Sequence, residues 1–251
     1  MQEILNQYPP ITLEQMSEVK LLNRIDTKYV TTIDKLQEFL RMAKEQYYVQ
    51  DYHGRRLMPY HTIYLDTPNL DMYMAHQDGK QHRYKVRMRM YENDGTTFME
   101  VKNKNNKGRT KKKRIRIPAL DYSKSEAREF VSHQVPYDAD RLSPTIENHF
   151  ERITLVNKRK TERLTIDVDL KLHNLINGNT KVLDNHAIIE LKREGLIESP
   201  AIEMLRNLHI EQCGFSKMAL GMAMTSPGLK QNMFKMRIHQ IEKMTHQTAT
   251  V

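Results

Sequence analysis

Residues 83–117 read RYKVRMRMYENDGTTFMEVKNKNNKGRTKKKRIRI, a stretch in which strand-like segments carry a charged residue at every second position. Two sets follow this spacing on either side of a turn at residues 93–95: Lys85, Arg87 and Arg89, then Glu100, Lys102 and Lys104. A strand has a period of two residues, so each set lies on one face of its strand. We therefore predict neighbouring strands that share one strongly basic face.

The positive charge of the chain is concentrated in this region. Residues 80–116 contain 14 Lys and Arg against three Asp and Glu, a local charge of +11, whereas the whole 251-residue chain carries +9. The remainder is therefore slightly acidic. A charge focused in one segment favours a defined anion site over a general affinity for acidic surfaces.

Apolar spacing predicts roughly eight strands, with helices towards both ends of the chain. A helix is expected from about residue 33 to 44, where five apolar residues form one stripe. Strands over residues 83–91, 97–104 and 111–117 follow one another closely, as in an antiparallel meander. We predict an α+β fold whose antiparallel sheet is curved or closed.

An inward-facing basic surface suggests a polyanionic ligand. Buried like charges repel one another and lose hydration, so such an interior is costly when it is empty. Phosphate oxygens that pair with each guanidinium and ammonium group remove that cost. We therefore expect the cations of the central strands, together with several from the run KKKRIR at residues 111–116, to bind a polyanion.

Two glutamates stand among these cations. Glu100 and Glu190 each precede a lysine by two residues, Lys102 and Lys192. A carboxylate does not bind phosphate directly, but it can hold Mg²⁺ or Mn²⁺ that bridges phosphate oxygens. We expect both glutamates to be metal ligands.

Each pattern also has a simpler interpretation. The run KKKRIR is typical of a solvated surface or a nucleic-acid patch, and RMRM at residues 87–90 fits the outer face of a strand. Glu190 could be a rim carboxylate paired with a lysine, and Lys217 a surface lysine at the start of a helix. Their joint occurrence on several strands favours an anion-filled interior. Sparse aromatic residues and the lack of Trp argue against nucleic acid.

The chain resembles the VTC domain, the polyphosphate polymerase branch of the triphosphate tunnel metalloenzymes, in its stand-alone bacterial form. The resemblance covers residues 22–222 and rests on short matches in order, among them RIDTKYV, YKVRMRMYE, FMEVKNK, FERITL, IIELK and GFSKM. It implies an eight-stranded antiparallel tunnel over residues 1–228, followed by a helical tail over residues 229–251. That tail is either a peripheral helix on the core or a helix for a partner or membrane surface.

The resemblance also implies roles for individual residues. Those that match catalytic positions are Lys28, Arg87, Arg89, Lys102, Arg152 and Lys217, and Ser216 matches a phosphate contact. Further phosphate contacts are expected at Lys85, Lys104, Lys113 and Lys192. Glu190 matches the metal-binding glutamate, and Glu100 resembles a second acidic tunnel residue.

The function implied is polyphosphate synthesis from ATP with Mn²⁺ or Mg²⁺. The same lining would serve a triphosphatase acting on inorganic or nucleoside triphosphate, or a polyphosphate-binding domain without turnover. No apolar run is long enough to span a bilayer, no secretion signal is apparent, and Cys213 is the only cysteine. We expect a cytoplasmic protein, reaching the inner membrane face only through a separate membrane-protein partner.

Overall fold

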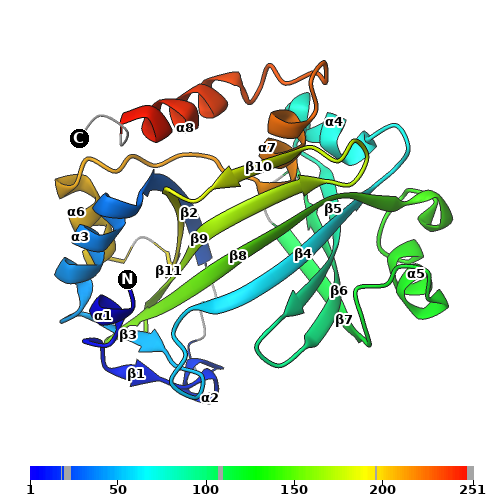
Figure 1. The fold of residues 1–251 in the computed structure, drawn as a ribbon. Coiled ribbons are helices and arrows are strands. Elements are labelled where there is room, and N and C mark those ends of the chain that lie inside the picture. The colour runs from blue at the N-terminus through cyan, green and yellow to red at the C-terminus, as the bar shows by residue number, and fades with distance from the viewer. Residues whose placement is uncertain (18, 20–23, 107–109, 196, 248–251) are drawn as a thin grey trace.

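The computed structural model describes residues 1–17, 19, 24–106, 110–195 and 197–247. Its centre is an antiparallel sheet that curls into a half-barrel (Figure 1). In spatial order its eight main strands are β2 (Arg24–Thr32), β11 (His186–Glu194), β9 (Glu162–Asn174), β8 (Ser143–Asn157), β4 (Met58–Asp66), β5 (Arg83–Tyr91), β6 (Thr96–Lys104) and β7 (Thr110–Ile117). The predicted α+β class and eight-stranded antiparallel sheet are confirmed.

Three short strands lie beside this path: β1 (Pro10–Ile11), β3 (Tyr47–Gln50) and β10 (Thr180–Leu183). β1 pairs in parallel with β3, which continues antiparallel to β8, and β10 pairs with β9. Within the described residues no pairing joins β2 to β7. The half-barrel is therefore not closed between these two strands, and the edge of β2 instead forms an isolated bridge between Tyr29 and Gln212.

Helices flank the sheet on both sides (Figure 1). They are α1 (Gln2–Leu5), α2 (Leu13–Ser17), α3 (Ile33–Ala43), α4 (Asp71–Gln77), α5 (Ser125–Ser132), the 3₁₀ turn η1 (Ala139–Arg141), α6 (Pro200–Asn207), α7 (Lys217–Thr225) and α8 (Lys235–Gln247). The helix expected near residues 33–44 is α3, and Thr32 caps it by accepting a hydrogen bond from the Lys35 amide.

The outer face of the sheet is covered at its two ends by different helices. Leu36, Phe39 and Leu40 of α3 pack with α1 and α6 against Ile153 of β8 and Ile166 of β9. At the other end, α5 shares a core with the outward-facing apolar residues of β5 and β6. Burial of both sets of apolar side chains leaves the opposite, inner face of the strands for polar residues.

The inner face is itself closed at one end by α7. This helix is buried almost all round and packs against Ile146 of β8 and Leu172 of β9. Gly221 permits the close approach, since a Cβ atom there would lie 2.5 Å from the Ile146 Cδ1 atom.

A β-bulge in β9 brings apolar and charged residues onto this one face. His149 of β8 pairs with Lys171, but Glu151 pairs with Val168, so β9 contains an extra residue. Asp169 takes up the bulge with a φ of 53°, in the left-handed region. As a result, both Leu170 and Asp167 face inward, although three positions separate them.

The C-terminal tail packs on the same core. Phe234 and Ile241 are buried, and His186 Nε2 of β11 lies 3.0 Å from the Ile241 carbonyl oxygen. The tail expected over residues 229–251 is described as far as residue 247, and residues 248–251 lie outside the described part. Within the described part, no helix combines the length and apolarity that crossing a membrane requires.

We predict that Asp169→Val destabilises the protein by about 1–3 kcal/mol, because a β-branched residue does not tolerate this left-handed conformation. Asp169→Gly should be neutral or slightly stabilising. Lys171→Val, at another exposed position of β9, serves as the control. Urea unfolding measures all three, and equal stability of the two Asp169 variants would contradict a strained bulge.

Candidate active site

The inner face of the half-barrel gathers charged side chains from seven neighbouring strands. Cross-strand partners share a face, and the registers pair Lys28 with Glu190, Arg152 with Asp167, and Arg87 with Glu100. The charged residues on this face include Lys28, Glu190, Lys192, Arg163, Asp167, Arg152, Lys85, Arg87, Arg89, Glu100, Lys102, Lys112 and Arg114. Cations therefore outnumber carboxylates about threefold.

Glu100 binds two cations at once. Arg87 donates to Glu100 Oε2 from Nη2 and Nε at 2.6 and 2.8 Å, and Lys112 pairs with Oε1. Burial alone would raise the pKa of Glu100, but Arg87, Arg89 and Lys112 hold it well below its usual range. The carboxylate is therefore ionised, and its role in this arrangement is to orient Arg87.

Asp167 makes a second unit of the same kind on β9. Arg152 donates to both carboxylate oxygens, at 2.6 and 2.9 Å, and the Lys217 ammonium group pairs with Oδ2. Burial opposes ionisation, but these two cations lower the pKa of Asp167 well below its ordinary value. A bidentate contact fixes the plane of the Arg152 guanidinium.

Glu190 holds its cations more loosely. Lys192 donates to Glu190 Oε2 at 2.5 Å, whereas Lys28 Nζ lies 3.9 Å from Oε1. The Glu190 side chain keeps 25% of its surface exposed, against none for Glu100. Despite burial, Lys192 and Lys28 hold the pKa of Glu190 well below its usual range. Glu190 thus has an oxygen that can accept a further ligand.

Several cations of the inner face have no carboxylate partner in the described part of the chain, and Arg89 and Lys102 are two of them. Arg89 is 6% exposed and donates one hydrogen bond, from Nε to Thr62 Oγ1 at 3.1 Å. Burial, then Arg87 and Arg152, lower its pKa. Lys102 faces the same side, and Arg87, followed by burial, lowers its pKa to about 6. Both groups have lost hydration without gaining a counter-charge, which favours an external anion.

The start of α7 adds polar groups at the edge of this face. Ser216 caps the helix by accepting from the Ala219 amide at 3.2 Å, and it also accepts from Lys85 Nζ at 2.9 Å. Burial, then Lys28, lower the pKa of Lys85 to about 7. Lys28 Nζ donates to the Phe215 carbonyl oxygen at 2.9 Å. The segment before α7 thereby connects β2, at one edge of the sheet, with β5.

Aromatic rings support several of the cations. The rings of Tyr60 and Phe150 are stacked with centroids 5.2 Å apart. The Arg152 guanidinium lies over both rings, and Lys217 Nζ lies 4.3 Å from the Phe150 centroid. These contacts orient the cations and partly offset their desolvation.

The structure brings together most of the residues expected from the sequence. All six expected catalytic residues lie on or beside the inner face, and so do Lys85, Lys192 and Ser216. Lys104 ends β6 opposite Arg83, on the same face as Lys102. Lys113 does not join them, because its partner is the core residue Val101, so it points to the opposite face. We therefore remove Lys113 from the site.

Four contributors were missed in the sequence: Asp167, Lys112, Tyr60 and Phe150. The alternation of Arg163, Thr165 and Asp167 was a usable signal for Asp167. The sequence did not show which of Lys112 and Lys113 faces inward. That depends on the register in which β6 pairs with β7, and the number of residues in the turn between them was not known. The aromatic pair is formed between β4 and β8, which are distant in sequence.

Of the two expected metal ligands, Glu190 fits a divalent ion better than Glu100. Mg²⁺ or Mn²⁺ needs only one or two carboxylates when phosphate oxygens complete its shell. Glu190 has a partly exposed carboxylate, whereas both oxygens of the fully buried Glu100 are bound by cations. Among the described residues, the one group of three close metal-ligating side chains, His61, Glu147 and His149, lies on the outer face.

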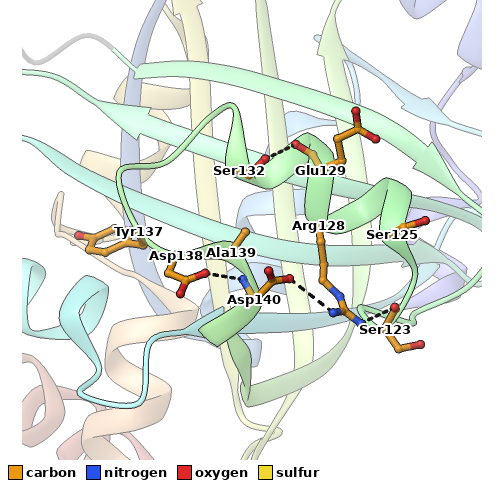
Figure 2. Close-up of a pocket in the computed structure, with 9 residues that line it drawn as sticks. All are labelled: Ser123, Ser125, Arg128, Glu129, Ser132, Tyr137, Asp138, Ala139 and Asp140. Carbon is orange, nitrogen blue, oxygen red and sulfur yellow. Dashed lines mark hydrogen bonds and ion pairs between the residues drawn. The ribbon is translucent and has the colours of Figure 1, made fainter.

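A separate hollow lies at α5 and η1, away from the inner face. Figure 2 shows its lining, in which Arg128 contacts the Asp140 carboxylate and the Ser123 carbonyl oxygen. Glu129 and Asp138 add further negative charge. A hollow whose single arginine is already engaged does not suit a phosphate ligand.

Comparison with known proteins gives both a family and a fold. A model of the VTC domain matches residues 23–226. No curated protein matches the chain in sequence. HpAC1 of Hippeastrum, provisionally assigned as an adenylyl cyclase and described as having a dominant triphosphatase activity, is similar in structure, with 13% identity, a TM-score of 0.50, and coverage of 83% of this chain and 100% of that one.

Two bacterial proteins provisionally assigned as adenylate cyclases are similar as well. The protein from Bacillus halodurans has 12% identity and a TM-score of 0.49, covering 78% of this chain and 96% of its own. The protein from Vibrio parahaemolyticus has 15% identity and a TM-score of 0.47, covering 80% of this chain and 99% of its own. At such identities the likeness concerns the fold alone.

We predict opposite effects on stability from removing two arginines of the inner face. Arg89→Met should stabilise the ligand-free protein by about 1–2 kcal/mol, because a buried cation without a carboxylate is replaced by an apolar group. Arg152→Met should destabilise it by about 2 kcal/mol, because Asp167 then keeps only Lys217. Thermal unfolding without phosphate measures both changes, and a loss of stability in Arg89→Met would contradict the unpaired state of Arg89.

Proposed function

The chain belongs to the VTC domain family, and from that membership we propose that it transfers the terminal phosphate of ATP to a growing polyphosphate chain on the inner face of the half-barrel. One observation carries the proposal furthest. Arg89 and Lys102 are basic residues without a carboxylate partner, and they lie on the same face as Arg87 and Arg152, whose guanidinium groups are already held in place. Such an arrangement favours a ligand with several linked anionic groups.

The reaction requires no covalent bond between the protein and the phosphates. An oxygen of the terminal phosphate of the growing chain attacks the γ-phosphorus of ATP, the bond from that phosphorus to the β-phosphate oxygen breaks, and ADP leaves. Positioning the phosphates and neutralising their charge supply most of the rate enhancement. Arg89 and Lys102 would bind the phosphate oxygens directly.

The other residues of the site orient and support these contacts. Glu100 and Asp167 fix the guanidinium planes of Arg87 and Arg152, which keep further N–H groups for the ligand. Ser216 places its hydroxyl beside Lys85 at the start of α7. A divalent ion such as Mn²⁺ or Mg²⁺, held by Glu190 and by phosphate oxygens, would neutralise additional charge on the triphosphate.

The second candidate is hydrolysis of inorganic or nucleoside triphosphate, in which water replaces the phosphate chain as acceptor. The description of HpAC1 of Hippeastrum as having a dominant triphosphatase activity favours it. A polyphosphate-binding domain without turnover would use the same contacts. Nucleic acid is disfavoured, because Tyr60 and Phe150 are stacked on each other beneath cations and cannot stack on bases.

The proposal places the reaction in the cytoplasm, where ATP is available. A separate membrane protein would have to supply any coupling to phosphate-chain export. The expected ligands are therefore ATP, inorganic polyphosphate and triphosphate.

Incubation of the purified protein with ATP and Mn²⁺ tests the proposal. Long-chain polyphosphate on a gel, with one ADP released for each phosphate added, is the expected result. Release of inorganic phosphate alone would identify a triphosphatase, and binding without turnover would identify a binding domain. Absence of both binding and turnover would overturn the assignment of the inner face.

Matched variants connect this activity to the inner face. Arg89→Met should lower turnover about 100-fold, the effect expected when one donor to a developing charge is removed. Lys113→Met should change turnover less than twofold, because this exposed lysine of β7 points to the opposite face. Comparable losses in the two variants would show that general basicity, and not the inner face, supports the reaction.

We also predict that polyphosphate binding takes up protons near neutral pH. In the ligand-free protein the pKa of Lys102 is lowered to about 6 by Arg87 and burial, that of Lys85 to about 7 by burial and Lys28, and that of Lys217 to about 8 by burial. A bound anion favours the charged form of each lysine, so their pKa values rise on binding.

Affinity for tripolyphosphate should therefore fall as the pH rises from about 6 to 9, through the lowered pKa values of these lysines. Calorimetric titration at pH about 7.5, in two buffers with different ionisation enthalpies, measures the protons taken up. Equal apparent enthalpies in both buffers would contradict the presence of neutral lysines in the ligand-free site.

A further inference from the structure

The outer face of the sheet carries a cluster of metal-ligating side chains that the proposed reaction does not use. His61 of β4 and His149 of β8 are cross-strand partners. They lie between the area covered by α1, α3 and α6 and the area covered by α5. The side chain of His149 is 48% exposed and that of His61 is 19% exposed, so the cluster can be reached from solvent.

Two carboxylates complete the cluster. Glu147 precedes His149 by two residues on β8, and its Oε2 atom lies 2.8 Å from His61 Nε2. Glu92 follows the end of β5, and its Oε1 atom lies 3.4 Å from His149 Nδ1. The two imidazole rings are stacked with centroids 3.9 Å apart and planes inclined by 20°.

The ligand atoms are close enough for a single ion. One nitrogen from each histidine and one oxygen of Glu147 all lie within 4.8 Å of one another. Ligands bonded at about 2.0–2.2 Å to one zinc ion must lie within about twice that distance of each other. The distances therefore suit one ion, and binding would require the stacked imidazole rings to turn so that a nitrogen lone pair of each points at it.

The strands hold the cluster's backbone in place, and the charge of its side chains matches that of a divalent ion. His61, His149 and Glu147 project from paired strands, so little backbone entropy is lost when an ion binds. Two neutral imidazoles and two carboxylates balance a dication. Lys171, the partner of His149 on β9, is the one nearby cation among these cross-strand neighbours, and its exposed side chain is free to extend into water.

We propose that His61, Glu147 and His149 form a zinc-type metal site on the outer face of the half-barrel, with Glu92 beside His149 as a second carboxylate. Imidazole nitrogen with carboxylate oxygen suits Zn²⁺ and other late first-row ions better than Mg²⁺ or Ca²⁺, which prefer oxygen alone. The site is distinct from the ion that Glu190 would hold with phosphate.

The expected role of this ion is structural. It would connect β4, β8 and the turn after β5. On β4 and β8 its ligands are immediate sequence neighbours of residues whose side chains point to the inner face. Thr62, which accepts from Arg89, follows His61 directly, and Phe150, beneath Lys217, follows His149. An ion on the outer face would thus tie together the two strands that support the unpaired arginine.

Titration of the full chain with Co²⁺ alone, without phosphate, tests the site by visible absorption. One equivalent should bind and give the d–d bands of a four- or five-coordinate ion, and Zn²⁺ should displace it. Thiolate charge-transfer bands should be absent, because Cys213 lies outside the cluster. Failure to bind one equivalent at micromolar protein would overturn the proposal.

Variants then locate the ion. Zn²⁺ at about a hundredfold excess over its Kd should raise the melting temperature of the unsubstituted protein by about 5–10 °C. His149→Ala and Glu147→Gln should each weaken binding by at least about tenfold. His133→Ala removes a histidine that directly follows α5, bonded to the Glu129 carbonyl oxygen and outside the cluster on β4 and β8, and should bind normally.

Two outcomes would contradict the location. Retention of the Co²⁺ bands in a His61→Ala/His149→Ala double variant would place the ion elsewhere, and so would an equal loss in His133→Ala. An equal stabilisation by Mg²⁺ would show an unspecific effect of divalent cations. None of these readouts depends on turnover, so they are independent of the proposed phosphotransfer.

Discussion

The repulsion among like charges on one face of a curled sheet is the constraint on which the rest of this structure depends. Glu100, Asp167 and Glu190 each neutralise part of it by binding two cations, which leaves about one positive charge per carboxylate unit. Arg89 and Lys102 lie outside these units. The carboxylates therefore reduce the cost of folding, and we propose that the remaining basic residues set the affinity for a polyanion.

This division separates residues that stabilise the protein from residues that bind. Arg152 is held by Asp167 on one side and lies over the rings of Tyr60 and Phe150 on the other, so its removal disturbs the folded state. Arg89 also lies over these rings, at 5.6 and 5.8 Å from their centroids, but it has no carboxylate partner and makes one hydrogen bond, to Thr62, so the ligand-free protein gains less from it. A site of this kind is kept for function at some expense of stability.

The sequence predicted those parts of the site that depend on local periodicity. The two-residue spacing placed Lys85, Arg87 and Arg89 on one face, and the family resemblance placed Arg152, Glu190 and Lys217 beside them. Contacts that depend on register could not be read in this way. The choice between Lys112 and Lys113 requires the pairing of β6 with β7, and the inward position of Leu170 depends on a bulge at Asp169 that no local pattern announces. The family resemblance implied an enclosed tunnel. In the described part of the chain, however, the first and last strands of the sheet, β2 and β7, do not pair.

The apolar packing of α7 on the inner face has an electrostatic consequence. Leu172, Ile146 and the buried helix fill one end of the half-barrel with a medium of low polarisability, which cannot screen the nearby cations as water does. The potential of the basic surface is therefore weaker in water on the side that α7 covers than on the side that it leaves open. If the proposed function holds, we expect a polyphosphate chain to be drawn to the site from that open side.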